Sequence, residues 1–346
     1  MPRAASRVAP PPQGATLGYA VTAVCARARI PCLMGKAAPI DLRRLKTYPI
    51  ARRKNLVDSG DFGFLANPRR AVDFINSLPD IYAGRDLRTL IHDVVRARRA
   101  RRAVVTAIGG HVIKVGGGPL LIDLIRRGAI TAVAMNGAAA IHDYELSLIG
   151  KTSEDVAEGL QDGSFGMARE TAAAFAEAAL VGAQGPGLGR AIGERALKNK
   201  LRKISVLAAC AKEGIPVTVH LSIGADITHM HPQASGSDLG EATLIDFRLL
   251  TGVVAGLDGG VWLNIGSAVM MPEVFLKAVS VARNLGHRLR EFTTVNLDMI
   301  QHYRPKANVL ARPRGKAIAI TGHREILLPL FRAGVAAAME GRAIRS

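Results

Sequence analysis

The sequence is short of several kinds of residue, and each shortage excludes a class of protein. Only three of its 346 residues are cysteine, which is too few for a disulfide framework. No apolar run reaches the roughly 18 uninterrupted residues that a membrane-spanning helix needs. We therefore expect a reduced, cytoplasmic protein that has no membrane partner.

Aromatic and acidic residues are also scarce. Aromatic residues make up 4% of the chain, and 28 Asp and Glu stand against 46 Lys and Arg, for a formal net charge of +18. Two basic groups, within residues 43–54 and 96–102, would attract phosphate backbones without choosing a sequence. Single-stranded nucleic acid, however, is bound by stacking rings. The composition therefore favours an anionic small molecule or cofactor, and a basic nucleic-acid-binding protein is the alternative.

The first 39 residues differ in character from the rest of the chain. They combine Pro10 to Pro12 with scattered arginines and a weak apolar stretch, and regular alternation begins near Ile40. We expect a disordered basic tail over residues 1–39, with Met34 as an alternative start, and a single domain over residues 40–346. A signal peptide is the other interpretation, but its apolar region would be short and would follow the three prolines.

A β-α-β unit typical of nucleotide binding lies between Ala103 and Glu145. A strand over 103–108 ends at two glycines, a glycine triplet leads into a helix that begins at Pro119, and a second strand over 130–135 breaks at Asn136-Gly137. Ligands bind in the crevice at the carboxyl ends of such parallel strands, and glycines let backbone N–H groups approach a phosphate. The spacing is not GxGxxG, so tight turns are the alternative. The residues predicted to bind a nucleotide here are Gly109, Gly110, Gly116, Gly117, Gly118, Asn136 and Gly137.

Ionisable side chains follow the second strand of this unit. His142, Asp143 and Glu145 fall within one turn of one another at a place where the fold does not require them. We predict that they act on substrate as acid, base or binding groups. The alternative is that Asp143 caps a helix over Tyr144–Gly150.

Two further clusters follow predicted strands. His229 and His231 come after a strand over 216–220, and we predict that they contact substrate, cofactor or a neighbouring subunit. With His220 and Asp226 nearby, a metal site is the alternative, but no Cys or Glu completes a ligand set, so we predict no metal. Asn296 and Asp298 end another strand, where an acidic residue can hold a ribose hydroxyl.

The same segments, in this order, resemble deoxyhypusine synthase. The resemblance covers residues 110–150, residues 187–220, the strand and turn Val261 to Pro272, and residues 292–313. The glycine triplet followed by NGAAAIHDYE also resembles the archaeal-type NAD-dependent ornithine cyclodeaminase family. The resemblance implies a Rossmann-like, doubly wound parallel sheet of the deoxyhypusine synthase type, NAD as cofactor with Gly266 and Ser267 in its site, an amine or amino-acid substrate oxidised transiently, and a homodimer or homotetramer.

One residue departs from the deoxyhypusine synthase pattern. Met270 stands where that family has the lysine that forms an imine, and a thioether cannot form one. Lys277 lies roughly 10 Å further along a predicted helix over 272–284, so we interpret it as a solvated residue. We therefore predict an NAD-dependent transferase or lyase that acts on an amine or amino acid but does not make deoxyhypusine. A nucleotide-binding regulatory protein without catalysis is the alternative.

Overall fold

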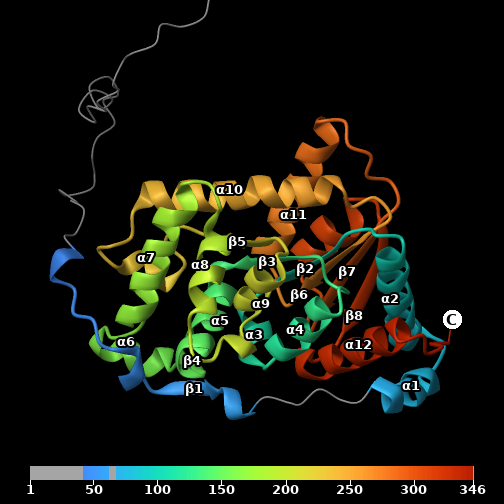
Figure 1. Cartoon of the computed structure of the whole chain (residues 1–346), viewed down its shortest axis with the longest axis horizontal. Coiled ribbons are helices and arrows are strands. Elements are labelled where there is room, and N and C mark those ends of the chain that lie inside the picture. The colour runs from blue at the N-terminus through green and yellow to red at the C-terminus, as the bar shows by residue number, and fades with distance from the viewer. Residues whose placement is uncertain (1–41, 62–67, 346) are drawn as a thin grey trace, which may run out of the picture. The chain divides into compact units, whose positions relative to one another are not determined.

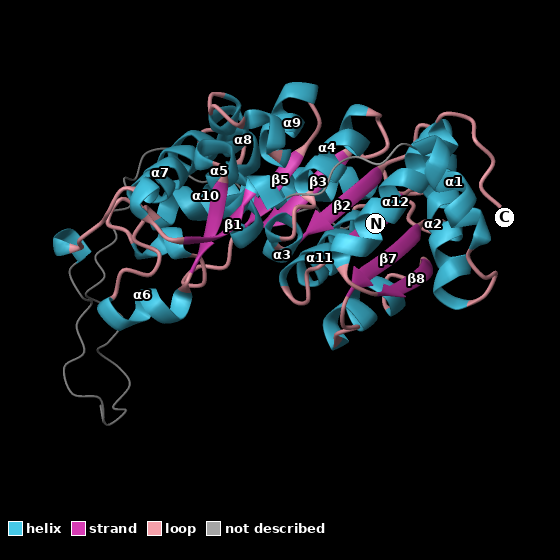
Figure 2. Ribbon diagram, turned by 90° about the horizontal axis from the view of Figure 1, so that it is seen from below, coloured by secondary structure: helices cyan, strands magenta, loops and turns pink. Residues whose placement is uncertain are grey.

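Six parallel strands form the central sheet of the computed structural model, which describes residues 42–61 and 68–345. Their order across the sheet is β5-β3-β2-β6-β7-β8; Figure 1 labels all six, and Figure 2 shows β5, β3 and β2 on one side of the sheet and β7 and β8 on the other. The strands are β2 (Val104–Ile108), β3 (Ala132–Asn136), β5 (Val217–His220), β6 (Val261–Ile265), β7 (Thr293–Asp298) and β8 (Lys316–Thr321). The chain winds outward from β2 to β5, returns to β6 and winds outward again to β8. The order therefore reverses between β2 and β6, which confirms the predicted doubly wound α/β class.

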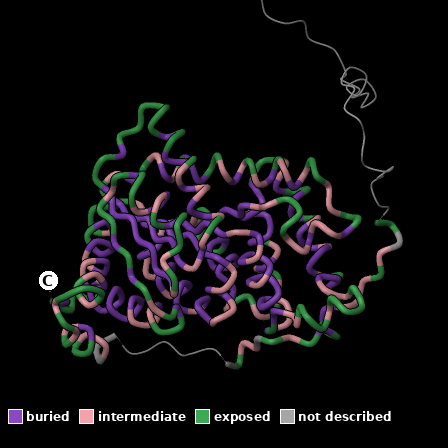
Figure 3. The backbone as a smooth tube through the Cα atoms, turned by 180° about the vertical axis from the view of Figure 1, so that it is seen from behind, coloured by how far each residue is buried: buried purple, intermediate pink, exposed green. Residues whose placement is uncertain are grey.

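Helices cover both faces of this sheet, so its central strands are apolar almost throughout. Every residue of β2 and β6 is buried. In register, Thr106 pairs with Val133 and Leu263 and shares one face with them, whereas Val105 and Trp262 share the other. Figure 3 shows the buried residues concentrated along the strands. Continuous burial of this kind is what a parallel sheet with two helical layers requires.

The two layers differ in size. One face packs against α2 (Tyr82–Arg99), α4 (Gly118–Arg126), α9 (Val206–Glu213) and α12 (Arg324–Met339). The other packs against α10 (Gly236–Ala255), α11 (Met270–Asn284) and the π-helix η6 (Pro305–Ala311). There Trp262 stacks on Phe275 with ring centroids 4.1 Å apart. Figure 1 shows α10 above the sheet and α12 below it.

Further elements lie beyond β5 and around the sheet. The antiparallel pair β1 and β4 forms a small second sheet. The remaining elements are η1 (Leu42–Arg44), η2 (Ile50–Arg52), β1 (Asn55–Asp58), η3 (Ser59–Asp61), α1 (Pro68–Ser77), α3 (Gly110–Lys114), α5 (Gly137–Ile149), β4 (Lys151–Glu154), α6 (Val156–Asp162), α7 (Arg169–Ala183), α8 (Leu188–Leu197), η4 (Arg202–Ile204) and η5 (Ile227–Met230).

One predicted helix begins earlier than expected. The helix predicted over Tyr144–Gly150 is α5, which starts at Gly137. Its N-cap is Asn136, whose side chain accepts a hydrogen bond from the Ala139 N–H at 3.0 Å, and the alanines that follow favour a helix. Asp143 therefore lies inside α5 and does not cap it.

The N-terminal prediction is not tested by the structure. The predicted basic tail of residues 1–39 and the alternative start at Met34 lie outside the described residues. Residues 42–346 group together as one compact unit. Among the described helices, none is both long and apolar enough to cross a membrane.

Candidate active site

A cavity of about 190 Å³ is built from the segments that follow β2, β3 and β5. Because these strands are parallel neighbours, their carboxyl ends meet at one edge of the sheet, where ligands of such folds bind. Its lining residues come from the segment before β1, from α3, α5 and β4, from residues 156–165, and from the loop after β5. They are Arg53, Lys114, Ala138, Ile141, His142, Glu145, Ser153, Glu154, Val156, Phe165, Ala225, Asp226 and Ile227.

A chain of hydrogen bonds runs from His142 into the protein interior. Nδ1 of His142 lies 2.8 Å from Oγ1 of Thr152, and the Thr152 hydroxyl lies 2.5 Å from Oε2 of Glu145. Glu145 is only 1% exposed and forms a two-pronged ion pair with Arg53, at 2.9 and 2.6 Å. Its Oε1 also accepts the Thr171 hydroxyl at 2.9 Å. His142 and Glu145, both predicted as site residues, therefore belong to one network.

The network fixes which nitrogen of His142 carries the proton. An ionised carboxylate only accepts hydrogen bonds, so the Thr152 hydroxyl donates to Glu145. The Thr152 oxygen must then accept a hydrogen bond from Nδ1–H of His142. This leaves Nε2 with a free lone pair on a side chain that lines the cavity, which is the form that a general base needs.

Burial keeps His142 uncharged. It lowers the pKa of the imidazole to about 4, and the cations Lys114 and Arg53 act in the same direction, while Glu145 opposes them. A neutral imidazole at physiological pH is therefore available to accept a proton.

The cavity carries charges of both signs. Lys114 has no hydrogen-bond or ion-pair partner in the described part of the chain, and it ends α3 at the cavity wall. On another wall, the Asp226 carboxylate packs so closely over Gly137 that a Cβ there would lie 2.3 Å from Oδ2. Burial raises the pKa of Asp226, so it would gain from a cationic partner. A cation and a carboxylate across one small cavity suit a zwitterion or an ammonium group.

Asp143 faces away from this cavity. It is fully buried and accepts hydrogen bonds from the Ser205 hydroxyl at 2.5 Å and from the N–H groups of Val206 and Leu207 at 2.8 and 3.0 Å. Burial raises its pKa to about 6, against the effect of these three donors. The structure thus corrects the expectation of a role on substrate, because the carboxylate anchors the first turn of α9.

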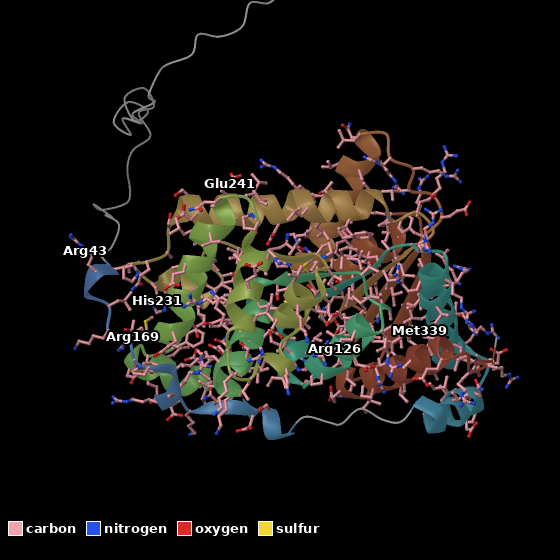
Figure 4. All side chains as sticks on the ribbon, in the orientation of Figure 1. Arg43, Arg126, Arg169, His231, Glu241 and Met339 are labelled. Atoms are coloured by element: carbon pink, nitrogen blue, oxygen red, sulfur yellow. The ribbon has the colours of Figure 1, made fainter. Side chains whose placement is uncertain are left out.

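The two histidines after β5 lie beside the cavity and not in its lining. Nε2 of His231 bonds to the Gly166 carbonyl at 2.8 Å, and Nδ1 of His229 accepts from the Gly224 N–H at 3.2 Å. The other ring nitrogen of each is buried without a partner among the described residues. Figure 4 labels His231 near α7, which η5 contacts. No cluster of three possible metal ligands occurs in the described part of the chain.

Glycines at the strand ends permit close contacts between chain segments. A Cβ on Gly109 would lie 2.2 Å from the Gly266 carbonyl oxygen, so the ends of β2 and β6 pack directly together. Gly110 lies against Ala138 and His142, which joins the turn after β2 to the cavity. Gly109, Gly110 and Gly266 therefore lie where the strand order reverses, which is the position at which sheets of this kind bind nucleotides.

The glycine triplet has a structural use. The N–H groups of Gly116 and Gly117 donate to the carbonyls of Ile113 and Val112 at 3.0 and 2.9 Å. A Cβ on Gly117 would lie 2.6 Å from the Val112 oxygen, and one on Gly118 would lie 3.1 Å from the Ile204 oxygen. The triplet therefore forms a tight turn between α3 and α4, and its geometry lends no support to the predicted phosphate contacts.

The residues predicted at the ends of β6 and β7 all have partners within the protein. Asn296 accepts from Asn264 at 2.7 Å and donates to Gln301 at 2.7 Å. Ser267 accepts the Met271 N–H at the start of α11. Asp298 forms an ion pair with Arg324, whose Nε lies 3.2 Å from Nδ1 of His111. Asp298 is therefore already paired, and Arg324 brings positive charge to the edge of β2, β6 and β7.

Some residues of the two basic groups have partners within the chain. Arg53 is buried against Glu145, and Lys54 pairs with Glu158. In the second group, Arg96 pairs with Asp93, and Arg98 donates to backbone carbonyls. The charge of these four residues is therefore balanced, or their donors are used, within the chain.

Sequence reasoning missed three charged residues of the cavity, Arg53, Lys114 and Asp226, and the buried Thr152 hydroxyl that bonds to His142. Arg53 was counted among surface charges, and Thr152 and Lys114 carry no motif. Asp226 was noted only as a neighbour of the histidines. The position of Asp226 just after a buried strand was the one available signal, because strand ends in parallel sheets carry ligand contacts.

No family model matches the chain, and no curated protein matches it. Among solved structures it is similar to a conserved protein from Methanococcus maripaludis provisionally named LOR/SDH, with 18% identity, a TM-score of 0.47 and coverage of 73% of this chain and 69% of that one. It is also similar to AgrE in complex with ornithine and NAD+, with 18% identity, a TM-score of 0.48 and coverage of 80% and 34%.

A protein from Entamoeba histolytica provisionally named deoxyhypusine synthase is a third such structure, with 12% identity, a TM-score of 0.45 and coverage of 79% and 94%. The chain thus spans about a third of the length of AgrE. The resemblance noted in the sequence recurs among these structures. With TM-scores below 0.5, these likenesses carry no information about the role of any residue in this chain.

We expect Asp143→Ala to lower the free energy of unfolding by roughly 3 kcal/mol or more, because three buried donors lose their acceptor. Urea unfolding followed by circular dichroism measures this. Asp155→Ala, which removes an exposed cap of α6, is the matched control and should cost about 1 kcal/mol. A fully stable Asp143→Ala protein with strongly reduced turnover would instead restore the catalytic interpretation.

We expect the His142 ring to titrate near pH 4 in an NMR titration, well below the roughly 6.5 of a histidine in an unfolded chain. Between pH 4 and roughly 6.5, the His142 ring is protonated in the unfolded chain and neutral in the folded chain. The contribution of neutral His142 to stability is therefore complete above about pH 6.5 and is lost as the pH falls toward 4. A midpoint at 6.5 would show that the ring is solvated.

Proposed function

We propose that this protein is an NAD-dependent enzyme that transiently oxidises the amine-bearing carbon of a small amine or amino acid. One observation carries the proposal: a small cavity at the carboxyl edge of the sheet combines a neutral His142 with Lys114 and Asp226. Oxidation of an amine needs a base for the nitrogen, a partner for its charge and a hydride acceptor nearby. The first two are present among the described side chains.

The strand order of the sheet favours a bound dinucleotide as the hydride acceptor. Its order reverses between β2 and β6, and dinucleotides bind at such a reversal. The turns Gly109-Gly110 and Gly266-Ser267 lie at this reversal, and together with the Arg324 guanidinium they would hold the phosphates. When bound there, NAD would supply the hydride acceptor for a substrate carbon in the adjacent cavity.

The substrate side of the site follows from charge. Asp226 would bind the substrate ammonium, and Lys114 would bind a carboxylate, which an amino acid has and a simple amine lacks. As a hydride leaves the carbon and a C=N bond forms in the substrate, Nε2 of His142 would take the proton that leaves the nitrogen. The apolar residues Ile141 and Phe165 in the cavity wall would limit water at this step.

The lysine chemistry of deoxyhypusine synthase finds no support in this chain. Met270 begins α11, and Lys277 is more than half exposed and pairs with Glu273. A lyase of the cyclodeaminase kind, which consumes no enzyme lysine, accords better with these residues. Met270 is also the observation that favours the second candidate, a nucleotide-binding protein without catalysis.

We further propose a cytoplasmic homo-oligomer. Cys210 is buried and unpaired, which accords with a reducing compartment. Large apolar side chains are exposed after four of the strands, at the edge where the cavity lies. They are Ile223, Val269, Ile300, Tyr303 and Ile326. A second copy that covers this edge would bury them.

The proposal predicts distinct effects of two substitutions in the cavity. Lys114→Met should raise KM roughly 10- to 100-fold for ornithine, the amino acid that AgrE binds, and leave KM unchanged for the diamine that lacks the carboxylate. Asp226→Asn should raise KM for both. Steady-state kinetics measure this, and Lys198→Met, at the exposed residue that follows the end of α8, is the control.

Cofactor binding is measured separately by calorimetry and by energy transfer from Trp262, the single tryptophan, to bound NADH. No heat and no thermal shift with millimolar NAD or NADP would end the dinucleotide proposal. Tight NAD binding with no turnover of any amine would favour the second candidate.

A further inference from the structure

Residues 48–58, which we name the strap, are bound along most of their length to residues 150–170. The Tyr48 N–H donates to the Met167 carbonyl at 3.2 Å, and the Arg169 N–H donates to the Tyr48 carbonyl at 3.0 Å. Further along, β1 pairs antiparallel with β4, with Val57 opposite Thr152. A segment far away in the sequence is thereby held against the strand that carries the hydroxyl bonded to His142.

Arg53 is the strap residue that reaches the interior. Its side chain is only 3% exposed, which is unusual for arginine. Its Nε donates to Asn55 at 2.9 Å, and its two terminal nitrogens donate to the two oxygens of Glu145. One terminal nitrogen also lies 3.7 Å from Oε1 of Glu154. The guanidinium is therefore committed to these two carboxylates, with its hydrogen bonds going to Glu145, and is not the group that binds a substrate anion.

Without this arginine, Glu145 would be a buried carboxylate with no cation bonded to it. A carboxylate in that situation takes up a proton. Protonated Glu145 would donate to Thr152, and the Thr152 hydroxyl would then donate to Nδ1 of His142. The ring proton would move to Nε2, and the lone pair needed in the cavity would be lost.

We propose that Arg53 is a positioning residue that holds His142 in its Nδ1-protonated tautomer, acting through Glu145 and Thr152. The strap thus completes the base, although no strap atom needs to touch the substrate. The catalytic consequence rests on the proposed function, whereas the tautomer is a property of the free protein.

Several charged groups surround His142 and would affect any titration. Glu145 lies on its own helix, Arg53 on the strap and Lys114 on α3, and all three influence its pKa. Asp226 and Glu154 line the same cavity from the loop after β5 and from β4. The test therefore compares tautomers at one neutral pH, where the ring is uncharged.

The experiment records the ring ¹⁵N chemical shifts of His142 in the NAD-free protein. We expect a protonated Nδ1 and a bare Nε2 in the wild type, and the reverse in Arg53→Gln. Arg53→Lys should keep the wild-type tautomer, because it still supplies a cation to Glu145. Arg52→Gln, an exposed neighbour on the strap, is the matched control and should change nothing.

Kinetics provide a second readout. Arg53→Gln should lower kcat at least about tenfold with KM for the amine unchanged, since it alters the base and not the binding groups. If the wild type turns over no amine, the proposed function fails, and the tautomer measurement still decides the role of Arg53.

Thr152→Val provides a second test that remains usable if Arg53→Gln does not fold, because it leaves the ion pair between Arg53 and Glu145 intact. Valine has no hydroxyl to connect Glu145 with His142. We therefore expect His142 in Thr152→Val to lose its preference for the tautomer protonated on Nδ1, as in Arg53→Gln. Folded Arg53→Gln or Thr152→Val protein whose His142 stays Nδ1-protonated would overturn the proposal. A wild type protonated on Nε2 would overturn it too.

Discussion

The buried carboxylate of Glu145 is the interaction on which the site depends. It joins Arg53 from the strap, Thr152 from β4 and Thr171 from α7 to the helix that carries His142. A charge in this position is costly unless it is paired and fully hydrogen-bonded, and here both of its oxygens have partners. The same bonds that satisfy the carboxylate orient the imidazole, so folding and site assembly are one event.

The sheet decides where this network can act. Because β2, β3 and β5 are parallel neighbours, α3, α5 and the loop after β5 all begin at one edge. The close packing of Gly110 on His142 then connects the network to the point where the strand order reverses. A cavity for a small charged molecule thus lies next to the place where this kind of sheet binds nucleotides.

Strands β2, β3, β5, β6 and β7 could be predicted from the sequence because buried parallel strands appear as short apolar runs that end in glycine or polar residues. The edge strand β8 and the pair β1 and β4 were not predicted, since they are not buried throughout. The start of α5 was misplaced, because Asn136-Gly137 looked like a turn although Asn136 caps a helix. Asp143 was assigned to the substrate because proximity in sequence to His142 suggested proximity in space. On a helix, adjacent residues point about 100° apart, so one faces the cavity and the other faces α9.

The residues that were missed share a physical reason. Arg53 contacts Glu145, which lies 92 positions further along the chain, and local pattern holds no information about such a pair. Thr152 reaches Glu145 and His142 because β4 lies beside α5, which only the fold defines. Lys114 and Asp226 matter because they line one cavity, which only the fold defines. The glycine triplet has a structural use as well, since these residues form the tight turn between α3 and α4.

The most direct test of the central claim is single-turnover absorbance of reduced nicotinamide, with enzyme and NAD in excess over ornithine or its diamine. Transient oxidation predicts a rise in that absorbance, slowed by deuterium at the amine-bearing carbon and abolished by His142→Ala, which should leave NAD binding intact. Turnover of the substrate with no reduced nicotinamide and no isotope effect would contradict the claim.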